Sequence, residues 1–494
     1  MTSPVAAWYL EPVIIHLNFL PKPGETGAGE VLAALFELLD QGRLDPELLP
    51  HLRLHLDWIQ YRANFREPVT VRRAADARGE RMALAELAVD LRRAPRDRLI
   101  DELGGALAAV GALERGTDGR VLVDDWAPLG DSSIWQFNRL FWQRLADWER
   151  HSGRGFEAAL PSGRSDANDP AAVADAVADF WTLLVELDKR GQLPAEIFAL
   201  EIGVGTGVRA GRWLDRFKAI DEARATDFYP RLRFLLADYS LPTLDRAMSA
   251  VAAHRDVVSM IATDALNPLR ALSFLRYKIL YVHLTNVYDN LPVDELVRRD
   301  GRIYLVETRA YVPGPVARTI AATYGVGPDR LRPTIARLLE TGPDLFGDRE
   351  RGVAFWRAVW DGLCLEERLR YLEGTADIPL PPGLHGDDLD ELLATAPADI
   401  RFHISRGAVE SFVNTVPLLH PRGYLQVQDI FVATMDEYRQ GFRGPGKLDG
   451  SVVNWVNGAL LGAVGARTGY DVHFAPFRYR PGSRTSILYT TLRE

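Results

Sequence analysis

Cysteine is almost absent from this sequence, and its absence restricts what the chain can be. The 494 residues contain one cysteine, Cys364. A single thiol excludes both an intramolecular disulfide and a zinc site built from cysteines. We expect no metal site, and the lack of disulfides favours a cytoplasmic location.

An excess of positive charge is also missing. The chain has 58 lysines and arginines against 67 aspartates and glutamates, a net charge of −9. It therefore lacks the general positive field that attracts nucleic acid or an anionic membrane. Long apolar runs are missing too, because the run at residues 13–20 is short and follows Glu11 and Pro12 instead of basic residues. The sequence predicts neither a signal peptide nor a membrane span, and neither nucleic acid nor a membrane as a partner.

The most informative segment that is present is a glycine-rich turn at residues 198–207, FALEIGVGTG. An apolar run leads into it and a helical pattern follows, which predicts a buried strand, a tight turn and a helix. The backbone N–H groups of such a turn can face a bound molecule. Val208 and Arg209 follow where a phosphate-binding P-loop needs Lys and Ser or Thr, and Val208 replaces the third glycine of a dinucleotide fingerprint. Both of those nucleotide sites are therefore excluded.

Three more apolar runs end in polar side chains. They cover residues 232–238, 257–265 and 278–286, and their ends carry Asp238, Asp264 and Thr285. Open parallel sheets bind ligands outside the carboxyl ends of their strands. A carboxylate such as Asp238 offers two acceptor oxygens, which suit a vicinal diol. We expect these strand ends and the glycine-rich turn to form one binding site.

The spacing E-x-G-x-G-x-G, together with these strand ends, resembles the class I S-adenosylmethionine (SAM) methyltransferases. The resemblance implies an α/β fold with a Rossmann-like sheet, a C-terminal antiparallel hairpin at residues 470–477 and 485–490, and SAM as the cofactor. In that family the acid of the turn holds the methionine ammonium and the glycines admit the methionine and ribose. The second strand end binds the ribose, the third meets the adenine and the fourth faces the methyl group. The implied cofactor-binding residues are Glu201, Gly203, Gly205, Gly207, Asp238, Asp264, Ala265 and Thr285.

Within this class the chain is distantly similar to the MidA family, which includes a protein-arginine methyltransferase that helps assemble respiratory complex I. The similarity lies in the long gap from Gly207 to Asp238, an insertion before the fifth strand, and the segment 285–292. That family carries Asn-Glu where this chain has Thr285 and Asn286. A guanidinium substrate favours a carboxylate that binds both of its nitrogens. The acceptor therefore remains open between a protein and a small molecule, and between an N and an O nucleophile.

Tyr288 and Asp289 follow the fourth strand, at the place where small-molecule O-methyltransferases carry a His-Asp pair. This position implies that the two residues are catalytic. An unperturbed tyrosine has a pKa near 10 and is a weak base at neutral pH. Methyl transfer can proceed by positioning alone, because a sulfonium is already a strong electrophile.

The front of the chain shows helical patterns at residues 30–39, 51–61, 84–91 and 99–110, followed by a hairpin signal at Asp118 and Gly119. This order resembles a winged helix. In DNA-binding proteins such a unit reads DNA, whereas in small-molecule O-methyltransferases it serves dimerisation and substrate enclosure. Acidic residues alternate with the arginines here, so we favour the second role and expect a homodimer.

These patterns predict four parts. They are an N-terminal winged-helix-like domain (1–130), connecting helices (131–190), a SAM-binding core (191–310 and 397–494) and a helical insertion (311–396). Within the insertion, Trp356 and Trp360 lie on one helical face and either close over the acceptor as a lid or pack in the core.

The function predicted is SAM-dependent methyl transfer to an N or O nucleophile of a protein or a small molecule. The alternative is a non-catalytic assembly or scaffold protein that keeps a SAM-binding fold. A DNA-binding regulator is the third and weakest interpretation.

Overall fold

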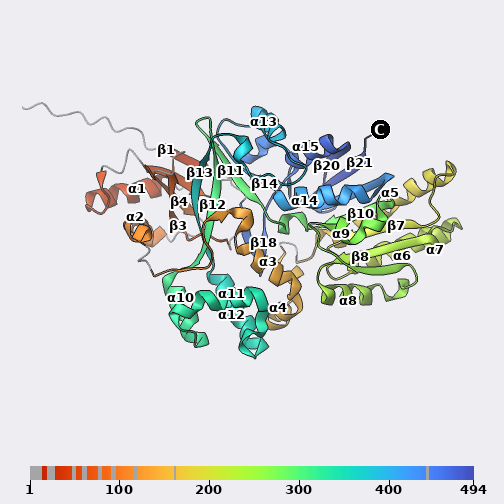
Figure 1. Cartoon of the computed structure of the whole chain (residues 1–494), viewed down its shortest axis with the longest axis horizontal. Helices are drawn as coiled ribbons and strands as arrows, with labels where there is room; N and C mark the ends of the chain where they lie inside the picture. The colour runs from red at the N-terminus through yellow and green to blue at the C-terminus, as the bar shows by residue number, and fades with distance from the viewer. Residues whose placement is uncertain are drawn as a thin grey trace, which may run out of the picture.

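The computed structural model describes residues 14–18, 28–46, 52–57, 64–75, 81–90, 96–115, 119–160, 163–440 and 444–493. In this part of the chain, two β-sheets lie side by side, and helix α3 (Ile134–Gln143) lies between them (Figure 1). No described helix combines the length and the apolarity that a membrane crossing requires.

The sheet at the right of Figure 1 has seven strands in the order β20-β21-β15-β10-β7-β8-β9. The five strands from β15 to β9 pair in parallel, and β20 and β21 form an antiparallel hairpin at one edge. This is the sheet expected for a class I methyltransferase, so the fold class is confirmed. The bounds are β7 (Ile197–Ile202), β8 (Leu232–Asp238), β9 (Val258–Ala262), β10 (Ile279–Thr285), β15 (Leu419–Asp429), β20 (Tyr470–Pro476) and β21 (Ser486–Leu492).

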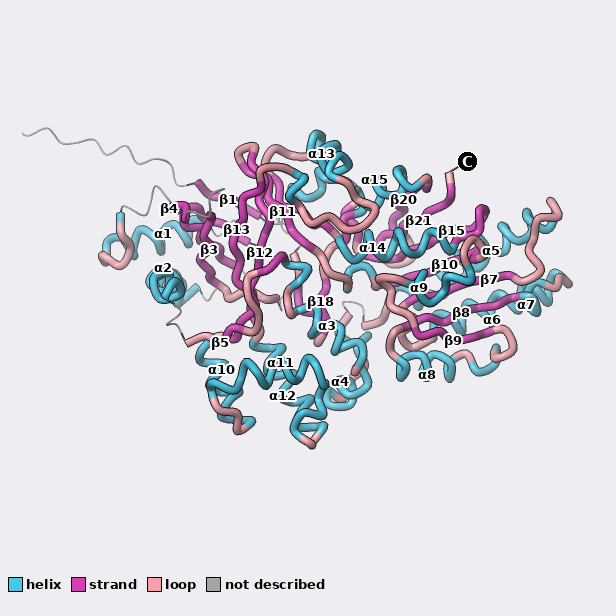
Figure 2. The backbone as a smooth tube through the Cα atoms, viewed as in Figure 1, coloured by secondary structure: helices cyan, strands magenta, loops and turns pink. Residues whose placement is uncertain are grey.

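Helices cover both faces of this sheet (Figure 2), because its central strands are apolar on both sides. One face packs against α5 (Pro170–Lys189), α6 (Val208–Arg224) and α8 (Leu241–Ala250). The other packs against α9 (Pro268–Leu272), α13 (Gly386–Thr395), α14 (Arg406–Thr415) and α15 (Gly458–Thr468). Helix α5 begins as its sequence dictates, since Asp169 accepts hydrogen bonds from the N–H groups of Ala171 and Ala172.

The second sheet combines strands from the front of the chain with strands from the insertion. Its order is β1-β2-β4-β3-β13-β12-β11-β14, and β5 and β6 also pair with β12. The front strands are β1 (Ile14–Asn18), β2 (Leu52–Asp57), β3 (Val69–Ala75), β4 (Arg81–Asp90), β5 (Val121–Leu122) and β6 (Ala127–Pro128). The later strands are β11 (Asp294–Arg299), β12 (Arg302–Val312), β13 (Cys364–Leu372) and β14 (Ile400–Ile404).

Helices of the insertion form a separate apolar cluster with α3 and α4 (Leu145–Ser152). They are α10 (Gly314–Tyr324), α11 (Leu331–Thr341) and α12 (Arg349–Gly362). Trp356 and Trp360 of α12 are fully buried in this cluster, and Trp356 lies 4.7 Å from the ring of Trp148. The two tryptophans therefore pack the core, and the lid interpretation was wrong. Short strands complete the fold: β16 (Phe431–Val432), β17 (Gly446–Leu448), β18 (Ser451–Val453) and β19 (Val456–Asn457).

The front of the chain differs from the prediction. Helices α1 (Ala28–Asp40) and α2 (Leu99–Arg115) match the expected helices, but β2 and β4 occupy the segments expected to be helices at 51–61 and 84–91. The winged-helix prediction was therefore wrong. Asp118 of the expected hairpin lies outside the described residues, and Gly119 precedes β5.

Two of the predicted domain boundaries also change. Strands β11 and β12 were expected in the core that ends at residue 310, and β14 in the core that resumes at 397. All three belong to the second sheet, because they pair with one another and with β13. The insertion therefore contributes a sheet as well as helices.

Candidate functional site

A cavity of about 400 Å³ lies at the carboxyl ends of β7, β8, β9 and β10. This is where an open parallel sheet binds its ligand. One wall is made by the turns that follow these four strands. The opposite wall is made by α3, by residues 156–157 and 165–168, and by the segment 290–292. The size falls within the usual range for small-molecule sites.

The glycine-rich turn between β7 and α6 forms the middle of the first wall. Gly203, Gly205 and Gly207 have φ angles of +75°, +52° and +74°, which favour glycine. A Cβ on Gly207 would lie 2.7 Å from Cα of Ala247, so the helix–helix approach requires glycine there. A Cβ on Gly205 would meet no described atom within 4 Å. Because Gly205 lines the cavity, a side chain there would occupy space that a ligand needs.

Glu201, at the end of β7, lines the cavity but forms an ion pair with Arg209 of α6. The oxygen-to-nitrogen distance is 2.7 Å, and each side chain is 5% exposed. Arg209 also donates a hydrogen bond of 2.6 Å to the Tyr281 hydroxyl. Burial raises the pKa of Glu201 and Arg209 partly opposes this. The sequence did not predict Arg209, and the assignment of Glu201 to a ligand ammonium stays a prediction.

Asp238 ends β8 and presents its carboxylate to the cavity. One of its oxygens accepts a hydrogen bond of 2.9 Å from the N–H of Ser240. Burial raises the pKa of Asp238 to about 6, although backbone N–H groups oppose the shift. Each carboxylate oxygen can accept more than one hydrogen bond, so Asp238 can still accept from a ligand hydroxyl.

The segment after β9 brings Asp264 and Ala265 to the cavity, as expected. One oxygen of Asp264 accepts a hydrogen bond of 3.0 Å from the N–H of Leu266, and the other lies 3.5 Å from Arg139 of α3. Thr263 also lines the cavity, and its buried hydroxyl has no partner within the described structure.

The wall formed by α3 was not predicted. Trp135, Arg139 and Trp142 of this helix line the cavity, and the guanidinium of Arg139 lies 5.8 Å from the ring centre of Tyr239 across it. The aromatic-rich sequence IWQFNRLFWQ was a signal of an amphipathic helix. Nothing in its local pattern indicated which sheet it would face.

The end of β10 brings Thr285, Asn286 and Val287 to the cavity. The Thr285 hydroxyl lies 2.6 Å from Nε2 of His283, two residues earlier on the same strand. Asn286 adopts a φ of +50°, a left-handed conformation that asparagine tolerates better than most residues. Thr285 thus lies where the sequence predicted it.

Tyr288 and Asp289 form the short turn η8 (Tyr288–Asn290) just beyond, but neither lines the main cavity. Tyr288 is fully buried and Asp289 is 6% exposed. Asp429, at the end of β15, accepts hydrogen bonds from the N–H groups of both residues and so holds the turn against the end of this strand. Asp289 lines a smaller neighbouring cavity together with Trp142, Phe156 and Asn290. The assignment of Tyr288 and Asp289 as catalytic residues stays a prediction.

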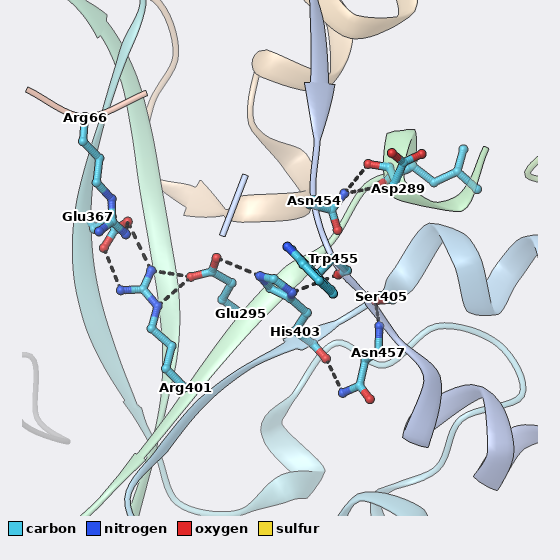
Figure 3. A network of polar contacts seen from close by, with 11 residues as sticks. Arg66, Asp289, Glu295, Glu367, Arg401, His403, Ser405, Asn454, Trp455 and Asn457 are labelled. Atoms are coloured by element: carbon cyan, nitrogen blue, oxygen red, sulfur yellow. Dashed lines mark hydrogen bonds and ion pairs between the residues drawn. The ribbon is translucent and has the colours of Figure 1, made fainter. Parts of the chain in front are cut away.

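A buried polar network connects this turn with the second sheet (Figure 3). The side-chain amide of Asn454 donates a hydrogen bond of 2.7 Å to the backbone oxygen of Asp289. The next residue, Trp455, accepts a hydrogen bond of 3.0 Å from Nδ1 of His403 through its backbone oxygen. The other nitrogen of His403 lies 3.3 Å from Glu295.

Beyond Glu295 the network is ionic. Glu295 is paired with Arg401, which is also paired with Glu367, and Glu367 is paired with Arg66 (Figure 3). Burial opposes the charge of Glu295, but Arg401 and His403 outweigh it and lower the pKa of its carboxyl. The second sheet therefore holds the turn that follows β10, and so positions one side of the cavity.

The chain matches no protein-family model. It also matches no curated protein by sequence. Its structure resembles solved structures, among them a Burkholderia thailandensis protein bound to S-adenosyl-homocysteine, at 13% identity and a TM-score of 0.44 over 78% of this chain and 92% of that one. Another is the CcbJ methyltransferase from Streptomyces caelestis, at 12% identity and a TM-score of 0.29 over 65% of this chain and 90% of that one.

Proposed function

We propose that this protein is a SAM-dependent methyltransferase that acts on an N or O nucleophile. The observation that carries the proposal is the cavity at the carboxyl ends of β7, β8, β9 and β10, in a sheet with the class I strand order. The residues there fit the cofactor. Gly205 leaves its side of the turn open, and Asp238 presents its carboxylate to the cavity at the end of β8.

In this site Asp238 would hold the ribose hydroxyls, and the turn at Gly203 and Gly205 would lie against the methionine and ribose parts. Asp264 and Ala265 would lie against the adenine, and Thr285 at the side of the methyl group. When bound, SAM supplies an electrophilic methyl group, whose bond to sulfur breaks as the acceptor's lone pair bonds to carbon, with the acceptor's proton passing to water. The protein's own contribution is to align the acceptor with the methyl group.

Calorimetric titration with SAM and with S-adenosylhomocysteine tests the proposal. Replacing Asp238 with Ala removes a charged hydrogen-bond acceptor and should weaken binding by about 1.5–3 kcal/mol. Asp245→Ala is the matched control, because Asp245 is an exposed carboxylate on α8 that does not line the cavity. Its affinity should equal that of the wild type. A wild-type protein that binds neither compound would refute the proposal.

A further inference from the structure

The part of the cavity beyond the strand ends is enclosed by apolar side chains. We name this part the acceptor chamber and define it by Trp135, Trp142, Phe156, Val287, Leu291 and Pro292. Both indole N–H groups are already used, since Trp135 donates to the backbone oxygen of Leu129 and Trp142 to the side chain of Asn290. The two indoles therefore offer mainly their apolar surfaces to a ligand.

The carboxylates that line the whole cavity already have partners or another task. Glu201 is paired with Arg209, Asp264 with Arg139, and Asp131 with Arg406 at 2.6 Å. Glu157 accepts a hydrogen bond of 3.1 Å from Asn168, and Asp238 lies at the end of β8, where we place the ribose. None of the six residues that define the acceptor chamber is a carboxylate, and Glu157, the described lining carboxylate beside Phe156, is held by the amide of Asn168. A guanidinium or ammonium taken from water would therefore lose its hydration without gaining a counter-charge, which is costly.

Asn286 is a polar side chain placed to orient an acceptor. Asn286 ends the strand at the side assigned to the methyl group, and its side-chain amide makes no hydrogen bond within the described structure. Its backbone is fixed on both sides, because its N–H donates to Gln428 and its carbonyl oxygen accepts from the side chain of Asn290. The neighbouring side-chain amide of Asn290 already makes three hydrogen bonds: it accepts from Trp142 and donates to Asn286 and Asp289. Asn286 thus offers one donor and one acceptor beside an apolar chamber.

We infer that the acceptor is a neutral small molecule with a flat apolar body, whose hydroxyl or uncharged amine is oriented by Asn286. This inference rests on the proposed function and names its substrate class. It excludes an arginine or lysine side chain of a protein as the preferred acceptor. Asn286 sets the preference for a neutral acceptor over a cationic one, because its side chain is an uncharged amide. An aspartate of similar size at this position would attract a cation.

The test compares a neutral and a cationic probe on protein saturated with S-adenosylhomocysteine. The probes are 2-naphthol and Nα-acetyl-arginine amide, and calorimetry measures their dissociation constants. We expect wild-type protein to bind 2-naphthol at least tenfold more tightly. Asn286→Asp adds a charge with almost no change in size, and aspartate also tolerates the left-handed backbone. It should shift the preference toward the cation by about tenfold or more.

Two further variants separate the amide from the backbone. Asn286→Gly keeps the left-handed conformation and removes the amide, and should weaken 2-naphthol binding by about fivefold. Asp300→Asn is the matched control, since Asp300 is also left-handed, with φ +50°, but is exposed and outside the cavity. It should leave both affinities unchanged.

The outcomes distinguish this inference from the proposed function. Failure of S-adenosylhomocysteine to bind would refute the proposed function itself. Normal binding of that compound, combined with equal or tighter binding of the arginine probe by wild-type protein, would overturn only the inference. An unchanged probe preference in Asn286→Asp would overturn the role of Asn286.

Discussion

Lowering the pH should weaken cofactor binding through one carboxyl group, that of Asp238. In the free protein, burial raises its pKa to about 6, well above the ordinary value of an aspartate. The ribose hydroxyls donate hydrogen bonds, so they favour the ionised carboxylate over the protonated acid. Affinity should therefore be complete well above pH 6 and fall as the pH decreases through 6.

The magnitude follows from the ionised fraction. For a pKa of about 6, roughly one molecule in eleven carries the ionised carboxylate at pH 5, against nearly all at pH 8. The dissociation constant for S-adenosylhomocysteine should then rise about tenfold between pH 8 and pH 5, equivalent to about 1.4 kcal/mol.

Calorimetry at half-unit pH steps measures this dependence, with circular dichroism confirming that the fold persists at pH 5. Asp238→Asn is the matched variant, since it keeps the shape of the side chain and removes its titration. Its affinity should be lower at pH 8 and change little with pH. A wild-type affinity that stays constant from pH 8 to pH 5, or an equal dependence in the variant, would refute the assignment of Asp238.

Three other changes test separate parts of the structure. Gly205→Val should abolish cofactor binding, measured by calorimetry, because the side chain enters the cavity; normal affinity would mean that the turn is only structural. Tyr288→Phe should keep the wild-type affinity for S-adenosylhomocysteine and the wild-type probe affinities, because Tyr288 does not line the cavity; a loss beyond threefold in either would return Tyr288 to the site. Glu295→Ala leaves Arg401 buried with one fewer partner, and should lower the free energy of unfolding in urea by about 3 kcal/mol. A loss below 1 kcal/mol would contradict the network's structural role.

The sequence predicted the strand ends that line the cavity because these features are local. The strands β8 and β10 end at Asp238 and Thr285, and the glycine-rich turn lies in a continuous segment. Short apolar runs and the residues that end them are visible in a sequence without knowledge of the partners.

The secondary structure of the front domain was predicted poorly because the spacing of its apolar residues fits both a strand and a helix. Leu52, Leu54 and Leu56 alternate as a strand requires, but the surrounding segment also allows a helix. Pairing of β2 with β4 decides the outcome, and that partner lies about thirty residues away. The burial of Tyr288 could not be predicted for a similar reason, since it depends on Asp429, 141 residues later in the chain.

The pairing of β13 with β3 has a consequence for how the chain is made. Arg73 and Arg368 are register partners in this parallel pair, so 295 residues (368 − 73) separate them. At a synthesis rate of about 5–20 residues per second, the free edge of β3 waits roughly 15–60 s for its partner strand on the ribosome. Exposed strand edges pair readily with other chains. Yield from the cell should therefore depend on chaperone supply during translation, and a fragment that stops before β13 should aggregate.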